Sequence, residues 1–268
     1  MRRVYFVFGM MMLLFVACTE DNKDETTGLT KFNLYLTDAP GKYEEVLIDI
    51  QEVRVHVTAD DSTHHENGWK DLEVNEGVYD LLDFTNDMDT LLATAELPAG
   101  KISQIRLILG ENNKVKVDGE YHDLKTPSGQ QSGIKLNVHE ILEEGIEYEL
   151  WIDFDACKSI VKTGNGKYLL KPVIKTYTRE TSGAIKGVVE PVASRPFIFA
   201  VSESDDTIST VADSLTGKFM LKGLPAGEYD VEFEPVDGFD DEEIEDVNVT
   251  LGVVTDLGTV QIEPEEDR

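Results

Sequence analysis

Residues 46–57 read Val-Leu-Ile-Asp-Ile-Gln-Glu-Val-Arg-Val-His-Val, and this stretch decides the fold class. Its β-branched residues occupy even-numbered positions up to Ile50, as in a strand that buries one face. From Val53 onward they occupy odd-numbered positions. One extra residue in a strand moves the buried set to the other face, so the switch across Gln51-Glu52 predicts a β-bulge or a bend.

The same period-two alternation recurs on both sides of this stretch. It is found at residues 32–36, 105–109, 115–117, 134–138 and 148–154, between clusters of Gly, Asp and Asn. Residues 168–176 contain Pro172, which predicts an edge or bulged strand. Residues 78–84 are expected to form a strand, and residues 89–95 a short helical turn. Many short strands with such turns predict a β-sandwich over residues 29–179.

A second set of strand patterns follows the polar segment 178–183. Residues 213–231 contain a turn, a strand, the tight connection Gly-Leu-Pro-Ala-Gly at 223–227, and another strand. Further strands are expected at 183–189, 197–201, 247–251 and 256–262. The sequence therefore predicts an all-β protein with two tandem β-sandwiches, immunoglobulin-like or prealbumin-like, the second over residues 183–262.

The N-terminus has the layout of an export signal. Two arginines precede an apolar run, Val4 to Ala17, which is too short for a comfortable membrane span. Leu14-Phe15-Val16-Ala17-Cys18 resembles the lipobox of bacterial lipoproteins, although Phe15 departs from the usual residue at its place. Residues 1–17 are thus expected to be a signal peptide and Cys18 the lipid attachment site. An ordinary signal peptide with a chance cysteine is the alternative.

The segments that flank the sandwiches are acidic. Residues 18–28 are polar and acidic, so they predict a flexible lipidated tether. Such a stretch behind the lipid cysteine resembles the surface-export signal of some Gram-negative lipoproteins, and a plain solvated linker is the alternative. Residues 263–268 form an acidic tail.

Several stretches of the first sandwich, taken in order, resemble domain-of-unknown-function family 4382, which occurs in surface lipoproteins. They are Leu-Thr-Asp-Ala-Pro-Gly at 36–41, Leu-Leu-Asp-Phe at 81–84, and the stretches 97–107, 153–161 and 169–174. The resemblance implies a β-sandwich and supplies no assigned chemistry. Residues 213–231 resemble a carboxypeptidase-regulatory-like domain, a small prealbumin-like sandwich, which implies a stalk or interaction role.

Charge and motif content exclude several functions. The formal net charge is −29, which repels phosphate backbones and argues against a nucleic-acid partner. Cys157 has no second cysteine to pair with if Cys18 is lipidated, and it is expected to be a small buried residue. No sequence motif for nucleophilic catalysis, a zinc site or phosphate binding occurs. No catalytic, cofactor-binding or metal-ligating residue is therefore assigned.

Two segments leave a structural calcium ion open as an alternative to having no cofactor. These are the carboxylate-rich segments 86–89 and 240–243, and a solvated acidic surface is the other interpretation. The adjacent pair His64-His65 lies in a polar stretch that is expected to be a solvated loop.

The function expected from these features is a non-catalytic binding, adhesion or assembly module. It would be lipid-anchored at the bacterial outer membrane, facing the cell exterior. Its partners would be the membrane, through the N-terminal lipid, and an extracellular protein or glycan. The candidate recognition loops are residues 60–68, 85–90 and 237–246. The alternative is an accessory or catalytic protein of glycan processing, whose carboxylates cannot be singled out among 53 acidic residues.

The lipobox predicts that Cys18 is essential for anchoring. Cys18→Ala is expected to release the protein from the membrane fraction or to block its processing, because the polypeptide has no other strong membrane-binding element. Membrane fractionation and labelling with radioactive palmitate measure this. Unchanged partitioning together with unchanged label would contradict lipidation at this residue.

Overall fold

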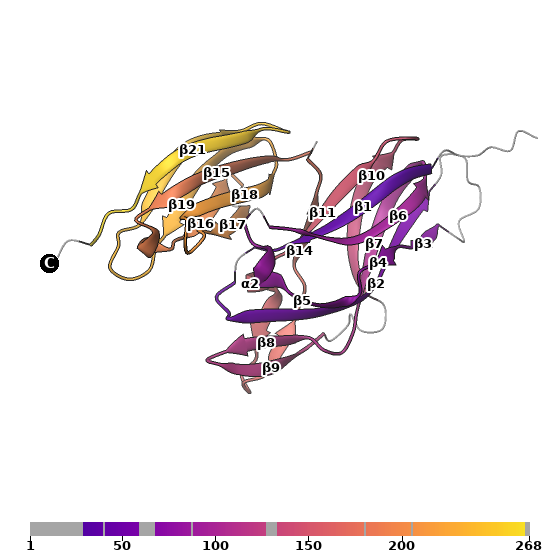
Figure 1. The fold of residues 1–268 in the computed structure, drawn as a ribbon, viewed down its shortest axis with the longest axis horizontal. Helices are drawn as coiled ribbons and strands as arrows, with labels where there is room; N and C mark the ends of the chain where they lie inside the picture. Colours follow the sequence, from indigo (N-terminus) through magenta and orange to yellow (C-terminus); the bar gives the residue numbers. More distant parts are fainter. Residues whose placement is uncertain are drawn as a thin grey trace, which may run out of the picture.

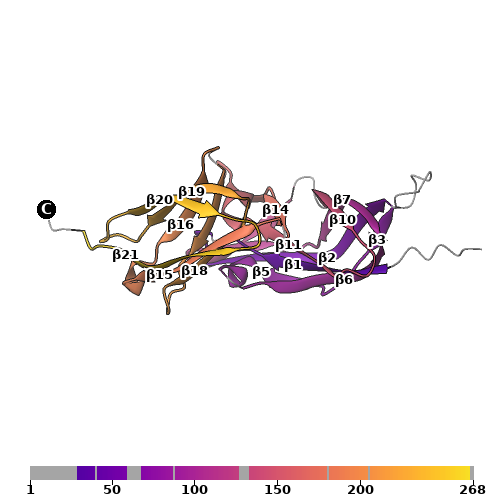
Figure 2. The same cartoon turned by 90° about the horizontal axis from the view of Figure 1, so that it is seen from above.

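The computed structural model describes residues 29–39, 41–58, 68–86, 88–126, 133–179, 181–204 and 206–265. These residues form an all-β protein, as the sequence predicts, and the strands fall into two groups along the long axis of the molecule (Figures 1 and 2). We call them the first sandwich (residues 29–179) and the second sandwich (residues 183–262). Helical structure within the described residues is limited to α2 (Ala156–Ser159) and the 3₁₀ turns η1 (Leu81–Phe84) and η2 (Val192–Ser194).

The first sandwich has two sheets that enclose one core. The five-stranded sheet has the order β14 (Ile174–Tyr177), β11 (Tyr148–Phe154), β1 (Leu29–Thr37), β6 (Thr90–Pro98) and β4 (Glu73–Val74). The nine-stranded sheet has the order β10 (Ile134–Leu142), β7 (Gly100–Leu109), β2 (Glu45–Thr58), β8 (Lys114–Val117), β9 (Glu120–Lys125), β13 (Tyr168–Leu170) and β12 (Ile160–Lys162). The short strands β3 (Trp69–Asp71) and β5 (Gly77–Asp80) also pair with β2.

The bulge that the sequence predicts in residues 46–57 is confirmed. β2 pairs with β7, and the register shifts between Ile50 and Glu52. The residues before the shift pair with β5 and β8, and most of those after it pair with β7 and β3. Because the shift changes the buried face, both halves of this long strand contribute to the core, with Ile48 and Val55 fully buried.

The second sandwich packs a three-stranded sheet on a four-stranded sheet. The first has the order β18 (Lys218–Leu224), β15 (Gly183–Glu190) and β21 (Val254–Gln261). The second has the order β17 (Thr207–Val211), β16 (Phe197–Ser202), β19 (Gly227–Glu234) and β20 (Glu242–Val249). Phe219 and Phe233 meet edge to face in the core between the sheets, at 5.6 Å between ring centroids.

Four local expectations are wrong. Residues 78–84 are not one strand, because β5 ends at Asp80 and Leu81–Phe84 form the 3₁₀ turn η1. Residues 89–95 are no helical turn, because β6 starts at Thr90; Leu92 enters the core while Leu91 stays exposed, which is a strand pattern. Residues 168–176 form two strands, β13 and β14, in different sheets, with Pro172 in the bend between them. Cys157 is exposed. It lies in the single turn of α2, which buries Ala156 and Ser159 and leaves the residues between them outside.

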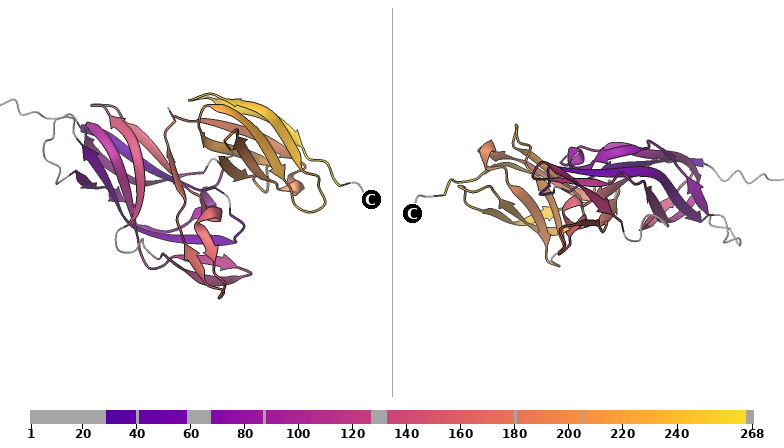
Figure 3. Two further views of the ribbon diagram at one scale, coloured as in Figure 1. Left: turned by 180° about the vertical axis from the view of Figure 1, so that it is seen from behind. Right: turned by 90° about the horizontal axis from the view of Figure 1, so that it is seen from below.

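The two sandwiches share no strand, and the chain passes between them once, as Figure 3 shows from behind. Hydrogen bonds order the connection. The hydroxyls of Thr178 and Thr181 lie 2.8 Å apart, and Ser182 Oγ donates to the carbonyl of Thr178 at 2.6 Å. Each sandwich has its own cluster of buried apolar side chains.

Separate cores predict that each sandwich folds alone. Residues 29–179 and residues 183–268, produced separately, are each expected to give a β-rich circular dichroism spectrum and one cooperative urea transition, since neither core needs side chains from the other. A helix-rich spectrum, or the absence of a transition in either piece, would contradict this.

Candidate functional site

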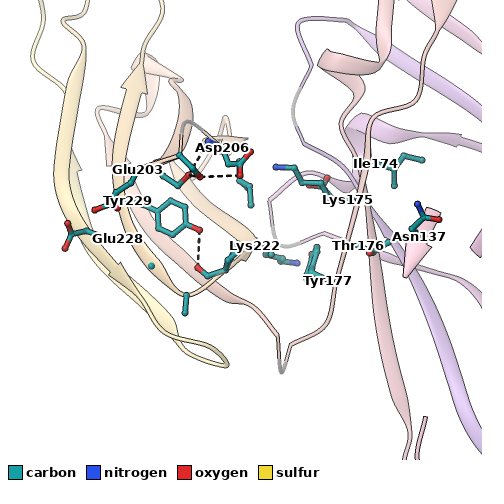
Figure 4. A pocket seen from close by; sticks show the side chains of 18 residues that line it. Asn137, Ile174, Lys175, Thr176, Tyr177, Glu203, Asp206, Lys222, Glu228 and Tyr229 are labelled. Atoms are coloured by element: carbon teal, nitrogen blue, oxygen red, sulfur yellow. Dashed lines mark hydrogen bonds between the residues drawn. The ribbon is translucent and has the colours of Figure 1, made fainter. Parts of the chain in front are cut away.

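The two sandwiches face each other across a cleft with a volume of about 780 Å³. All four residues of β14 line one wall, and the opposite wall comes from the β18–β19 turn and from residues 202–208 (Figure 4). The side chains of Lys175 and Tyr177 point from the first sandwich toward the second. Lys175 Nζ crosses the gap and donates to the carbonyl of Thr207 at 3.2 Å.

Strand pairing explains why these side chains share a face. β1 and β11 are parallel neighbours that place Tyr35 opposite Trp151, and β11 and β14 are antiparallel neighbours that place Trp151 opposite Tyr177. Residues opposite one another lie on the same side of a sheet. The intervening residues, such as Leu150, enter the core of the first sandwich, so the aromatic set lies on the outer face.

The aromatic side chains stack as a ladder across the three strands. The Tyr35 and Trp151 rings are 5.0 Å apart with an interplanar angle of 14°, and the Trp151 and Tyr177 rings are 5.9 Å apart at 12°. The guanidinium of Arg179 lies 5.0 Å from the centre of the Trp151 ring, a cation–π contact. Together these neighbours leave Trp151 only 3% exposed.

The ladder ends on the second sandwich at Gly223. This residue has φ +72°, a conformation that glycine adopts without steric cost. A Cβ placed there would lie 2.7 Å from Cδ1 of Tyr177. The first glycine of the Gly-Leu-Pro-Ala-Gly connection therefore serves both the backbone turn and the close approach of the tyrosine ring.

The loop at residues 85–90 also contacts the second sandwich. Trp151 Nε1 donates to Asp89 Oδ2 at 2.9 Å, and Lys222 Nζ lies 3.8 Å from the same oxygen. Thr210 Oγ1 donates to Asn86 Oδ1 at 2.8 Å. Residues 85–90 are expected from the sequence to be a recognition loop, but the side chains of Asn86 and Asp89 already form hydrogen bonds within the molecule.

Two carboxylates lie beside this contact. Asp38 is 5% exposed, and its Oδ1 accepts from the backbone N–H of Ala156 at 3.0 Å. Burial, followed by the charge of Asp153, raises the pKa of Asp38 well above its usual range. Burial and then the charge of Asp155 raise the pKa of Asp153 to about 6, while Lys175 and Lys158 oppose the rise.

Several sequence-predicted residues fall elsewhere. The structure does not describe Cys18 or residues 60–67, which include the pair His64-His65. Residues 237–246 are mostly exposed, but they are a loop only in part, because β20 begins at Glu242. The second tryptophan, Trp69, is not singled out by the sequence; it lies in β3 of the other sheet, under the guanidinium of Arg106 at 4.1 Å, apart from Trp151.

The described part of the chain brings no three His, Cys, Asp or Glu side chains together as a metal-binding group. Within the same residues, no helix is long and apolar enough to cross a membrane.

Comparison with known protein families identifies one family. A family model described as a domain of unknown function (DUF4382) matches residues 29–172, more than half of the 268 residues. The chain therefore belongs to that family, as the stretches in the first sandwich suggest. No curated protein gives a significant match.

Solved structures show only distant likeness. The minor pilin GBS52 of Streptococcus agalactiae is 9% identical, with a TM-score of 0.27 over 88% of this chain and 98% of that one. A variant of the shaft pilin SpaA from Lactobacillus rhamnosus GG is 12% identical, with a TM-score of 0.24 over 90% and 100%. The Bacillus anthracis TIE protein is 13% identical, with a TM-score of 0.25 over 88% of this chain, which spans 34% of that protein. Function has to be argued from the residues themselves.

The sequence analysis does not predict this site, although two stretches that contribute to it stand out in the sequence. The stretches 36–41 and 153–161 carry the family resemblance, and each contributes a buried carboxylate to the site. Asp38 and Ala156, 118 residues apart, are joined by a hydrogen bond. What the sequence does not supply is the pairing of β1 with β11, which brings the two stretches together.

The Tyr177–Gly223 contact predicts that alanine substitutions at two glycines lower the free energy of unfolding by different amounts. Gly223→Ala and Gly258→Ala both force a side chain into φ near +70°, each costing about 1–2 kcal/mol. Only the first places a Cβ against Tyr177, whereas Gly258 has open space around it. The free energy of unfolding measured in urea should therefore be lower for Gly223→Ala than for Gly258→Ala by ~1 kcal/mol or more.

A double-mutant cycle separates the ring contact from backbone strain. In a Tyr177→Ala background the additional loss at Gly223 should disappear, because the ring that the new methyl group meets is gone. Equal losses for the two glycines in the presence of Tyr177 would show that the ring does not pack closely on the turn.

Proposed function

We propose that this protein is a non-catalytic binding or assembly module whose ligand site is the cleft between the two sandwiches. The single observation that carries the proposal is the composition of that cleft, which both sandwiches line. Its volume of about 780 Å³ is in the range of sites for small ligands or short chain segments, roughly 300–1,000 Å³. The ligand that fits is a segment of a polymer and not the face of a whole domain.

The lining residues favour a polar, hydroxyl-rich ligand such as a glycan segment. Lys175 and Lys222 supply donors, and Glu203, Asp206 and Glu228 supply acceptors. The rings of Tyr177 and Tyr229 add flat apolar surface beside these groups. Charges of both signs line the cleft, and the acidic side chains outnumber the lysines, so a strongly anionic ligand is disfavoured.

Catalysis on a glycan is less well supported than binding. The carboxylates with the most altered pKa values are Asp38 and Asp153, and altered acids are the usual candidates for glycosidase chemistry. Both line a cavity of about 20 Å³, which has room for a single water molecule or ion. Asp153 also lines the larger cleft, whereas Asp38 does not. A sugar ring does not fit in the small cavity, so a glycan in the cleft would meet one carboxylate of this pair and not both.

The anchor belongs to the same proposal. A lipid on Cys18 would hold the protein at the outer membrane, with residues 18–28 as tether and the sandwiches facing the cell exterior. β1 enters the first sandwich at the end remote from the second (Figure 1). Such an arrangement would keep the first sandwich near the membrane and display the cleft and the second sandwich beyond it.

A glycan array followed by calorimetry tests the proposal. Lys175→Ala and Glu203→Ala are expected to weaken binding of the array hit about tenfold each, equivalent to ~1.4 kcal/mol, because each removes a polar group at the cleft surface. Lys167→Ala, an exposed lysine in the β12–β13 turn, is the matched control and should bind as the wild type does.

Two results would contradict the proposed role. One is unchanged affinity in both cleft variants, which would place the ligand elsewhere. The other is turnover of a polysaccharide by the purified protein, abolished by a single carboxylate-to-amide change, which would make the protein an enzyme.

A further inference from the structure

We propose that Asp38 and Asp153 bind one calcium ion at the contact between the two sandwiches. The two carboxylates share a small cavity beside the larger cleft, which Asp153 also lines. The inference does not require a ligand in that cleft. The inference gives a role to the stretches 36–41 and 153–161, which carry the family resemblance and otherwise contribute only to the fold.

The first observation is a pair of buried carboxylate oxygens that no described residue satisfies. Oδ2 of Asp38 and Oδ1 of Asp153 are buried without a hydrogen-bond partner. Strand pairing brings the two segments together, because Thr37 lies opposite Asp153, and both carboxylates line the same small cavity. A buried acceptor without a partner destabilises the folded state, and one with a negative charge does so more strongly. Something else is expected to satisfy these oxygens.

The second observation is the cavity that both carboxylates line. Its volume of about 20 Å³ suits one ion or one water molecule. The other lining residues with side-chain oxygens come from both sandwiches: Thr37, Asn86 and Tyr177 from the first, and Ser209 and Thr210 from the second. Carboxylate, amide and hydroxyl oxygens suit a hard cation, for which the thioether of Met220, also in the lining, is a poor ligand.

Calcium fits this donor set better than magnesium. Calcium accepts six to eight oxygen ligands in irregular arrangements, whereas magnesium requires a near-ideal octahedron and keeps several of its waters. With only two carboxylates, the remaining ligands would be neutral oxygens and water, so the affinity should be moderate. An ion here would contact both sandwiches and so stiffen their connection.

The neighbouring cations compete with an ion at this place, because Lys175 and Lys158 act to lower the pKa of Asp153. Asp155 is already paired, since its Oδ2 lies 3.0 Å from Lys158 Nζ. Lys222 also lines the cavity, and its ammonium lies 3.8 Å from Asp89 Oδ2. That ammonium would repel a cation, which gives the proposal a second test: removing it should strengthen binding.

Terbium luminescence on the purified full-length protein is the direct experiment, because Tb³⁺ replaces Ca²⁺ and is excited by nearby aromatic rings. Tyr177 lines the cavity and stacks on Trp151, so the wild type should give sensitised emission that Ca²⁺ displaces and Mg²⁺ displaces much less well. Calorimetry should then detect one calcium site above the weak binding expected of a chain with net charge −29.

Variants identify the ligands. Asp38→Asn and Asp153→Asn should each weaken calcium binding at least about tenfold, and Lys222→Met should tighten it. Asp241→Asn removes the same charge from an exposed position and should leave the site unchanged. The amide variants should also lose the calcium-dependent rise in melting temperature that the wild type is expected to show.

The wild type alone can overturn the proposal, whether or not the variants fold. Absence of calcium-displaceable emission, together with the same melting temperature in calcium and in a chelator, would show that a water molecule or a shared proton occupies the cavity. Equal loss of affinity in Asp241→Asn and Asp153→Asn would show only diffuse binding to the acidic surface. Glycan binding in the cleft would be untouched by either result.

Discussion

The parallel pairing of β1 with β11 is the constraint on which the rest of the site depends. Six residue pairs, from Phe32 opposite Tyr148 to Thr37 opposite Asp153, join segments more than 110 residues apart. Because side chains alternate along both strands, this register sends Leu34 and Leu150 into the core. It also sends Tyr35 and Trp151 to the outer face. A shift by one residue would exchange the two sets and remove the core and the aromatic ladder together.

The sequence alone predicts most of the first sandwich as strands, and it predicts the bulge in β2 from a change of parity. It does not predict which strands pair with one another. The neighbour of β1 depends on how the two sheets pack over a common core. The alternation of residues within one strand does not indicate which strand lies beside it. The same limit applies to short strands such as β4 and β12, whose two or three residues are too few to show a period.

The misplaced expectations have local physical causes. The apolar pair Leu91-Leu92 suggests a helical turn, yet in β6 one of these side chains is buried and the other is exposed. Cys157 follows a strand and resembles a core residue by composition, but the single turn of α2 rotates it outward. The candidate site could be predicted only in part, because its residues come from five separate segments that meet through tertiary structure.

The contact between the sandwiches is mostly polar, and this decides how the two parts can behave. A wide apolar interface would hold them in one arrangement through burial of surface. Here the described contacts include single hydrogen bonds, one glycine–ring contact, one ion pair and one cation–π contact. Each of these bonds contributes little net free energy, about 0.5–1.5 kcal/mol, because water competes for the same groups. Buried carboxylates at such a contact oppose it unless their charge is neutralised. We therefore expect the relative position of the sandwiches to respond to whatever neutralises Asp38 and Asp153, since each hydrophobic core is a separate cluster.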